Sequence, residues 1–321
     1  MHHAIRRGWI AFLCIASSSP IWADSTAVSE PALEEVLIIG SKTAARNVSG
    51  SANFISEQDL ERFDQIDLRK VLNQVAGVYI REEDGFGLRP NIGIRGAAAE
   101  RSQKVTIMRD GVLITPAPYS APAAYYIPNV SRIASVEVLK GPAATAYGPH
   151  TVGGAINLAS PSIPGGSSEG FVDLSVGSDG YYKGQASYGA TKGNFGYVFD
   201  LLSYGADGFK RVDGSNQDTG FERNDIGIKF AYALPQSRFE HRLSFLLEVG
   251  DEVADETYLG LTDEDFRATP NRRYAASQLA EFTSEHYNAL LNYSARLTSK
   301  NTTNIKLYWN KFDRSWNKLD R

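Results

Sequence analysis

The sequence is poor in the residues that carry thiolate, redox and metal chemistry. Among its 321 residues are one cysteine, Cys14, and five histidines. Cys14 falls in an N-terminal segment that we expect to be removed, so the mature chain has no thiol for a disulfide, a metal site or a nucleophile. His150, His241 and His286 lack metal-ligand spacing, and no serine has the surroundings of a nucleophile elbow. The sequence predicts neither an enzyme nor a resident cofactor.

Two further absences concern charge and long apolar runs. The net charge is −4, so the basic face that nucleic-acid-binding proteins need is missing and no nucleic-acid partner is expected. Beyond the N-terminus no apolar run reaches about 18 residues, which excludes a membrane-spanning helix. The mean hydropathy of −0.28 leaves a membrane barrel open, because barrel strands alternate lipid-facing and lumen-facing residues.

The N-terminus has the order of a secretory signal peptide. Arg6 and Arg7 form a short basic region, Gly8–Ala16 is mostly apolar, and the small residue Ala23 precedes Asp24. A membrane anchor is the alternative, but it needs about 20 apolar residues and this run is shorter. We therefore expect residues 1–23 to be cleaved and residues 24–45 to form a flexible leader.

Residues 46–160 predict a small α+β domain with one mixed sheet. A helix is expected over Ser56–Val75, where apolar residues recur at helical spacing, and Asp110-Gly111 predicts a tight turn. The expected strands are short and apolar, namely Val78–Ile80, Ile92–Ile94, Val105–Met108, Glu137–Leu139 and Ala155–Leu158. The glycine-rich stretch Glu137–Leu158 matches no phosphate-binding fingerprint.

After a Ser/Pro/Gly-rich linker at residues 161–168, residues 169–321 alternate apolar and polar side chains with period two. Seven strands are expected, at Glu169–Gly177, Tyr181–Ala190, Phe195–Tyr204, Glu222–Ala233, Phe239–Val249, Thr283–Leu297 and Thr302–Arg314. Except for the short first turn, long connections alternate with short ones. That asymmetry favours an outer-membrane barrel over a β-sandwich. A plugged lumen needs about 22 strands, so we expect this to be part of a barrel, from a truncated product or a partial record.

Four short motifs in the first domain carry a family resemblance. They are NIGIRG at Asn91–Gly96, MRDG at Met108–Gly111, VEVLKG at Val136–Gly141 and YGPHTVGGAIN at Tyr147–Asn157. Together they resemble the plug domain of TonB-dependent outer-membrane receptors. The resemblance implies an α+β plug followed by part of an antiparallel transmembrane β-barrel, seated in outer-membrane lipid. It also implies TonB-dependent uptake of a ferric chelate, citrate or another siderophore, with iron as chelated substrate rather than cofactor.

The resemblance also implies an energy-coupling peptide, the TonB box, just before the plug. The segment in that place is Glu34, Glu35, Val36, Leu37, Ile38, Ile39 and Gly40. An extended aliphatic segment on a flexible leader can add as a strand to the sheet edge of a partner, here TonB. The alternative is that these residues are simply the first strand of the domain.

Substrate contacts in this family come from plug apex loops and external loops. The candidates, which most resemble those of ferric-citrate-type receptors, are Thr115, Tyr119, Tyr125 and Tyr126 in the plug, and Arg267, Arg272 and Arg273 in a long connection. Arginine can bind carboxylates in a bidentate way. Because that connection is also rich in acidic residues, a merely solvated charged loop remains the alternative.

Two basic plug residues, Arg95 and Lys140, resemble groups that lock a plug to glutamates of the barrel wall. For Lys140 a plain surface charge is the alternative. Two rival functions remain open. A sensory receptor would need a folded signalling domain before the box, where only a short leader stands, and an ungated porin or adhesin would need no plug motifs.

Overall fold

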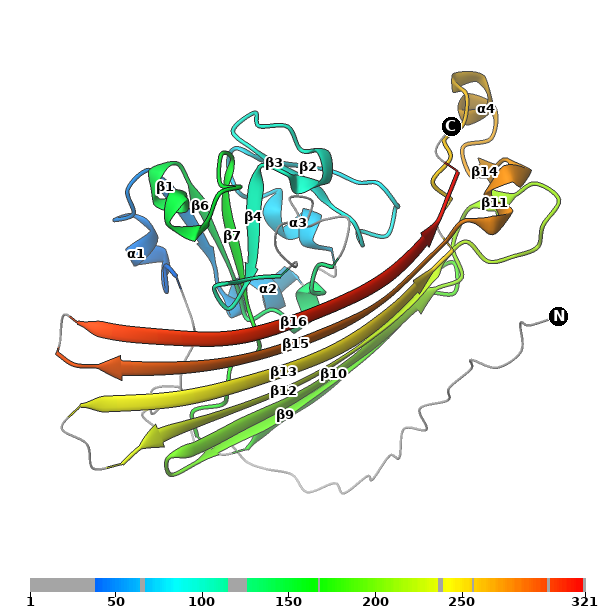
Figure 1. The fold of residues 1–321 in the computed structure, drawn as a ribbon. Coiled ribbons are helices and arrows are strands. Elements are labelled where there is room, and N and C mark those ends of the chain that lie inside the picture. The colour runs from blue at the N-terminus through cyan, green and yellow to red at the C-terminus, as the bar shows by residue number, and fades with distance from the viewer. Residues whose placement is uncertain are drawn as a thin grey trace.

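The computed structural model describes residues 38–63, 67–114, 126–166, 168–235, 239–255, 257–298 and 301–319. The signal peptide, most of the leader and residues Glu34–Leu37 lie outside this part of the chain. A plug with a mixed sheet packs against the concave face of a long, curved antiparallel sheet, which we call the wall (Figure 1). No helix in the described ranges is long and apolar enough to cross a bilayer.

The predicted mixed sheet of the plug is confirmed. Its strand order is β1-β6-β7-β4-β5, with β4 and β7 parallel and the other pairs antiparallel. The bounds are β1 (Ser51–Ile55), β4 (Val105–Arg109), β5 (Val112–Leu113), β6 (Ser135–Lys140) and β7 (Gly154–Ala159). A separate antiparallel pair is formed by β2 (Val78–Arg81) and β3 (Asn91–Ile94). Short 3-10 turns are η1 (Glu100–Ser102), η3 (Val130–Arg132) and η4 (Pro142–Tyr147).

The prediction of one helix over Ser56–Val75 is wrong. The structure has two short helices, α2 (Glu57–Phe63) and α3 (Leu68–Leu72). Asp67 is extended and its carboxylate accepts a hydrogen bond from the Arg69 amide at 2.8 Å, which caps a new helix instead of continuing the first. The predicted apolar stripe survives on α3, where it enters the plug core.

The glycine-rich stretch is framework within that core. Ile156 and Leu158 of β7 and Val138 of β6 are fully buried against β4. At Gly154 a Cβ atom would lie 2.4 Å from the Leu139 carbonyl oxygen, so only glycine lets β6 and β7 approach this closely. The stretch therefore packs the sheet and leaves no cradle for a ligand.

The wall contains all seven predicted strands in the described part of the chain, in the order β16-β15-β13-β12-β10-β9-β8. Their bounds are β8 (Glu169–Val176), β9 (Tyr182–Lys192), β10 (Phe195–Ala206), β12 (Phe221–Leu234), β13 (Glu240–Ala254), β15 (Glu281–Arg296) and β16 (Thr302–Asn317). Short turns join them at one end, beside α1 (Lys42–Ala45). The long connections at the other end carry β11 (Arg211–Val212), α4 (Asp263–Ala268), β14 (Arg272–Arg273) and η5 (Ala275–Leu279) (Figure 1). We call this the loop end.

The wall buries polar side chains and exposes apolar ones, which is the reverse of a sheet in a soluble protein. On β12, Arg223, Asp225 and Lys229 are buried, whereas Ile226 and Tyr232 are 46% and 43% exposed. The polar side chains turn toward the plug and the apolar ones turn away from it. Outer-membrane barrels have this pattern, because their outer face meets lipid and their lumen is polar.

Two expected connecting segments pack against the domains they join. Residues 42–45, expected as the end of a flexible leader, form α1, which Ser41 caps by accepting a hydrogen bond from the Ala44 amide at 3.0 Å. In the expected linker, Ile163 is buried against Val198 and Ala231 of the wall. The plug is thus continuous with the wall through packed residues.

Candidate functional site

The plug is fastened to the wall by buried arginines, and Arg132 of η3 is central. Its side chain is fully buried, and its Nε atom binds Asp200 of β10. Nη1 lies 3.4 Å from the Asp225 carboxylate of β12 and Nη2 lies 3.5 Å from that of Glu248 on β13. Burial alone would lower the pKa of Arg132, but these carboxylates raise it, so the guanidinium stays charged.

A second arginine shares Glu248. Arg109, at the end of β4, places Nη2 2.7 Å from the Glu248 carboxylate and also donates to the carbonyl oxygens of Ala159 and Arg132. Its pKa is raised because Glu248 outweighs the effect of burial. Asn288 of β15 donates to the other oxygen of Glu248 at 3.1 Å. One wall carboxylate therefore joins two plug arginines to a neighbouring strand.

Nearer the loop end a further layer repeats the arrangement. Arg89 of the plug lies 2.5 Å from the Glu252 carboxylate of β13, and its guanidinium stacks 3.8 Å from the Phe282 ring. Arg223 of β12 lies 3.1 Å from Asp225 and 3.6 Å from Glu252. Breaking one partner of such a buried pair is costly, because the other charge is left without compensation.

Tyr126, predicted to contact substrate, lies in this interface. Its ring stacks on His286 of β15 with centroids 3.9 Å apart, and the Arg223 guanidinium lies 4.7 Å from the ring centroid. Its hydroxyl is 3.5 Å from Asp225, and burial raises its pKa. The structure therefore places Tyr126 between plug and wall rather than on an open surface.

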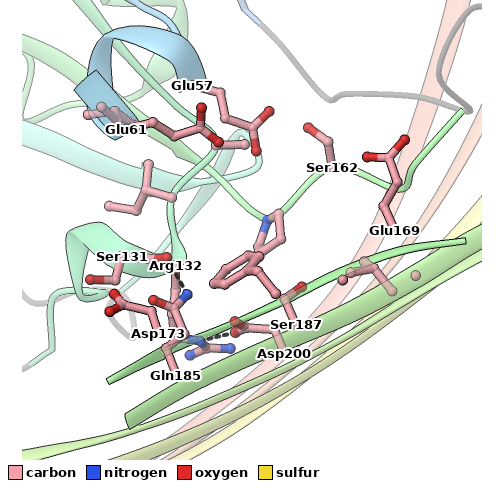
Figure 2. Close-up of a pocket in the computed structure, with 18 of the residues that line it drawn as sticks. Glu57, Glu61, Ser131, Arg132, Ser162, Glu169, Asp173, Gln185, Ser187 and Asp200 are labelled. Carbon is pink, nitrogen blue, oxygen red and sulfur yellow. Dashed lines mark hydrogen bonds and ion pairs between the residues drawn. The ribbon is translucent and has the colours of Figure 1, made fainter. Parts of the chain in front are cut away.

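Beside these contacts the plug and the wall separate around a cavity of about 480 Å³. Figure 2 shows Glu57 and Glu61 of α2 on one side of it, with Asp173 and Gln185 of the wall on the other. The Arg132–Asp200 pair borders the cavity (Figure 2). At the edge of the cavity the plug still contacts β9, because the Gln185 side chain donates to the Ser131 carbonyl oxygen at 2.6 Å.

A different contact holds the N-terminal end of the described chain. The amides of Ile38, Ile39 and Gly40, the last three residues of the predicted TonB box, all donate to the Glu137 carboxylate of β6. The distances run from 2.7 to 3.1 Å, and Glu137 is fully buried. We call this contact the clasp.

Of the two predicted lock residues, Lys140 has its contacts within the plug. The Lys140 ammonium donates to the Asn53 side chain at 2.7 Å and to the Ala76 carbonyl at 2.8 Å, both within the plug. Burial and the nearby Arg95 charge lower its pKa. Lys140 is thus an internal plug contact in the described part of the chain, because the end of β6 places it beside Asn53 of β1 and the segment after α3. For Arg95, a lock role stays a prediction.

The other predicted substrate residues fall into two groups. Thr115, Tyr119 and Tyr125 lie outside the described residues. Arg267, Arg272 and Arg273 lie at the loop end, where α4 and β14 bring them onto one connection. Arg272 pairs with Asp213 at 2.9 Å and Asp265 at 3.0 Å, while Arg273 donates to Thr257 at 3.1 Å. These contacts fold the connection onto β11, and a substrate role stays a prediction.

Sequence reasoning missed Arg89, Arg109 and Arg132 as the plug groups that reach the wall. Arg109 directly precedes the predicted Asp110-Gly111 turn and carries no further signal in the sequence. The available signal was on the other side of the interface, since Asp200, Asp225 and Glu248 are acidic residues inside strands whose apolar residues recur with period two. Carboxylates on the inner face of such strands need cationic partners.

An α+β plug bound by its arginines to the polar face of an outward-apolar antiparallel sheet is the arrangement expected for a plugged outer-membrane receptor. Residues 44–155 match the TonB-dependent Receptor Plug Domain family. Residues 44–155 of the chain are accordingly a plug domain of this family.

Similar proteins agree with this assignment. The vitamin B12 transporter BtuB of Photobacterium profundum is 27% identical over 218 residues, which are 67% of this chain and 32% of that protein. The vitamin B12 transporter BtuB of Vibrio vulnificus is 27% identical over 276 residues, which are 81% of this chain and 42% of that protein. Among solved structures, the unliganded ferric citrate transporter FecA matches with a TM-score of 0.71 at 24% identity, over 90% of this chain and 43% of that one. The ferric yersiniabactin receptor FyuA of Yersinia pestis gives 0.70 at 20% identity, over 85% and 42%. The chain spans less than half the length of each.

Proposed function

We propose that this protein takes part in TonB-dependent uptake of a ferric chelate, citrate or another siderophore, across the outer membrane. The observation that carries the proposal is the joint arrangement of the clasp and the plug–wall ion pairs. A segment suited to strand addition is held on a plug that itself closes the inner face of a wall. Substrate binds at the loop end, and TonB draws on the N-terminal segment to open a path past the plug.

A cationic group at the loop end favours an anionic substrate. Arg101 of η1 lies 5.7 Å from the Trp316 ring, and its Nη2 is 3.5 Å from the Tyr258 hydroxyl. Lys318 lies 4.5 Å from the Trp316 ring and 3.6 Å from the Tyr258 ring. Within the described ranges, neither Arg101 nor Lys318 forms an ion pair with a carboxylate. Two cations held by aromatic faces suit the carboxylates of a ferric chelate better than neutral groups do.

The uptake experiment compares cells that express the receptor with and without TonB. Labelled ferric citrate, a second ferric siderophore and vitamin B12 are supplied separately, since the similar proteins include carriers of both substrate types. We expect uptake of a ferric chelate only when TonB is present. Uptake that is equal without TonB would favour an ungated pore, and preferential uptake of vitamin B12 would overturn the substrate assignment.

Replacing Arg101 with glutamine tests the cationic group. A charge-assisted hydrogen bond contributes about 1.5–3 kcal/mol, so we expect ferric citrate to bind about 10- to 100-fold more weakly. Isothermal titration with the purified protein measures this change. Arg296→Gln is the matched control, because Arg296 is exposed and pairs with Glu240 at 3.0 Å at the short-turn end of the wall, opposite the loop end. A loss only in an Arg272→Ala, Arg273→Ala variant would instead assign the site to β14.

A further inference from the structure

In the clasp, successive backbone amides form a binding site for the anionic Glu137 side chain. Gly40 has φ of +78°, which turns the chain so that successive amides converge on one point. One oxygen of Glu137 accepts from the amides of Ile38, Ile39 and Gly40, and the second accepts again from Ile38. Glu137 comes from β6, nearly a hundred positions along the chain, so this contact fastens the N-terminal segment to the centre of the plug sheet.

The contact continues from Glu137 toward the wall. Asn157 of β7 donates to the second Glu137 oxygen at 2.8 Å, and the Asn157 side-chain oxygen accepts from the Gly111 amide at 2.7 Å. Gly111 belongs to the turn after β4, two residues from Arg109 and its 2.7 Å contact with Glu248. Two side chains, Glu137 and Asn157, and the backbone between Gly111 and Arg109 thus connect the N-terminal segment to a plug–wall ion pair.

We propose that Glu137 is the release point of the coupling segment. The clasp holds the segment on the plug until TonB pulls, and the Asn157–Gly111 connection passes the pull to Arg109 at the wall. This inference rests on the proposed TonB-dependent function for the identity of the pulling partner, whereas the clasp itself can be tested without that partner. Charge-assisted bonds to several amides suit this role, because they are strong together and yet can break one after another.

Glu137→Gln tests the clasp with little change of shape. The amide keeps one acceptor oxygen, but its NH₂ group then faces the Ile38 amide and the Asn157 NH₂ group, which are both donors. Hydrogen exchange of the full chain in detergent reports the amides of Ile38, Ile39 and Gly40. In the wild type we expect them to be protected well above a free peptide, and in the variant to exchange about tenfold faster or more.

Ser41→Ala is the matched control. It removes the cap of α1 one residue beyond the clasp but no acceptor for these three amides, so their exchange should stay unchanged. Exchange within β6 and β7 shows whether each variant has folded. If glutamine disturbs those strands, Glu137→Asp withdraws the carboxylate by one methylene and is expected to give the same acceleration. Wild-type amides that exchange like a free peptide, or acceleration that Ser41→Ala matches, would overturn the clasp.

Binding of the purified periplasmic domain of TonB separates the clasp from its proposed use. If the clasp must open before TonB can bind, Glu137→Gln should bind this domain up to about tenfold more tightly than the wild type in the absence of substrate. Faster exchange together with unchanged affinity would overturn the release-point role and leave TonB coupling standing. If exchange is faster in the variant but the TonB domain binds neither the wild type nor the variant, the proposed function is contradicted and the clasp still stands.

Discussion

Arg132→Met is expected to destabilise the docking of the plug on the wall by about 3–5 kcal/mol, which is the cost of breaking a buried ion pair by removing one partner. Arg132 has no exposed side-chain surface, and its guanidinium lies among Asp200, Asp225 and Glu248. Methionine fills a similar volume but carries no charge. Asp200 then loses its contact with the Nε atom of Arg132, while Glu248 keeps its contact with Arg109.

Urea unfolding of the chain in detergent measures this loss. Trp316 is a suitable reporter, because its ring lies 5.6 Å from the guanidinium of the plug residue Arg89. Arg267→Met is the control. The Arg267–Asp263 pair is exposed on both sides, so its removal should change stability by less than about 1 kcal/mol. Equal midpoints for the two variants would show that the buried cluster does not hold the plug.

Asp200→Asn combined with Arg132→Met sharpens the test. If Asp200 is destabilised by losing its cation, neutralising it should recover part of the loss, because an asparagine without a partner costs less to bury than a carboxylate. The pair in a double-mutant cycle would then show a coupling well above the few tenths of a kcal/mol expected for independent sites. If the stability losses of the two single variants simply add, Arg132 acts through another partner, for example Glu248.

Period and turn chemistry predicted most of the fold because they are local properties. All seven wall strands were predicted, since inner and outer faces alternate along each of them. The end of β13 was missed. The predicted strand ends at Val249, before the acidic residues Asp251 and Glu252, whereas β13 continues to Ala254 and Glu252 is buried there and paired with Arg89. From sequence alone an acidic residue is expected to be solvated unless its partner is known, and the partner of Glu252, Arg89, lies 163 residues away.

The candidate site depended on such distant pairs and was therefore less predictable. Arg132 stands between Ser131 and Ile133 without any local signature, and its Asp200 partner is 68 residues away. The motif that contains Lys140 did identify the right strand, β6. The residue of that motif that binds the N-terminal segment is Glu137, whose side chain also accepts a hydrogen bond from Asn157 of β7. The position of the motif thus identified the strand that carries the contact, while the direction in which each side chain points determined which residue makes it.

Tyr126→Ala is the second large effect, expected at about 3–5 kcal/mol for the loss of a fully buried aromatic ring. The ring lies between His286 and the Arg223 guanidinium, and the side chain is buried. Alanine leaves a cavity between plug and wall and removes both ring contacts. The same urea experiment measures the change, and a loss below about 1 kcal/mol would mean that the interface closes around the gap or does not need the ring.

Tyr126→Phe distinguishes an interface residue from a substrate contact. Phenylalanine keeps the stack on His286 and loses only a 3.5 Å approach to Asp225, so stability should fall by less than about 1 kcal/mol. If Tyr126 is a plug–wall residue, ferric citrate affinity should also be unchanged. A tenfold weaker affinity with unchanged stability would return Tyr126 to the substrate site. Because the hydroxyl is buried beside Asp225 and Arg223, such a result would require the plug to leave the wall when substrate binds.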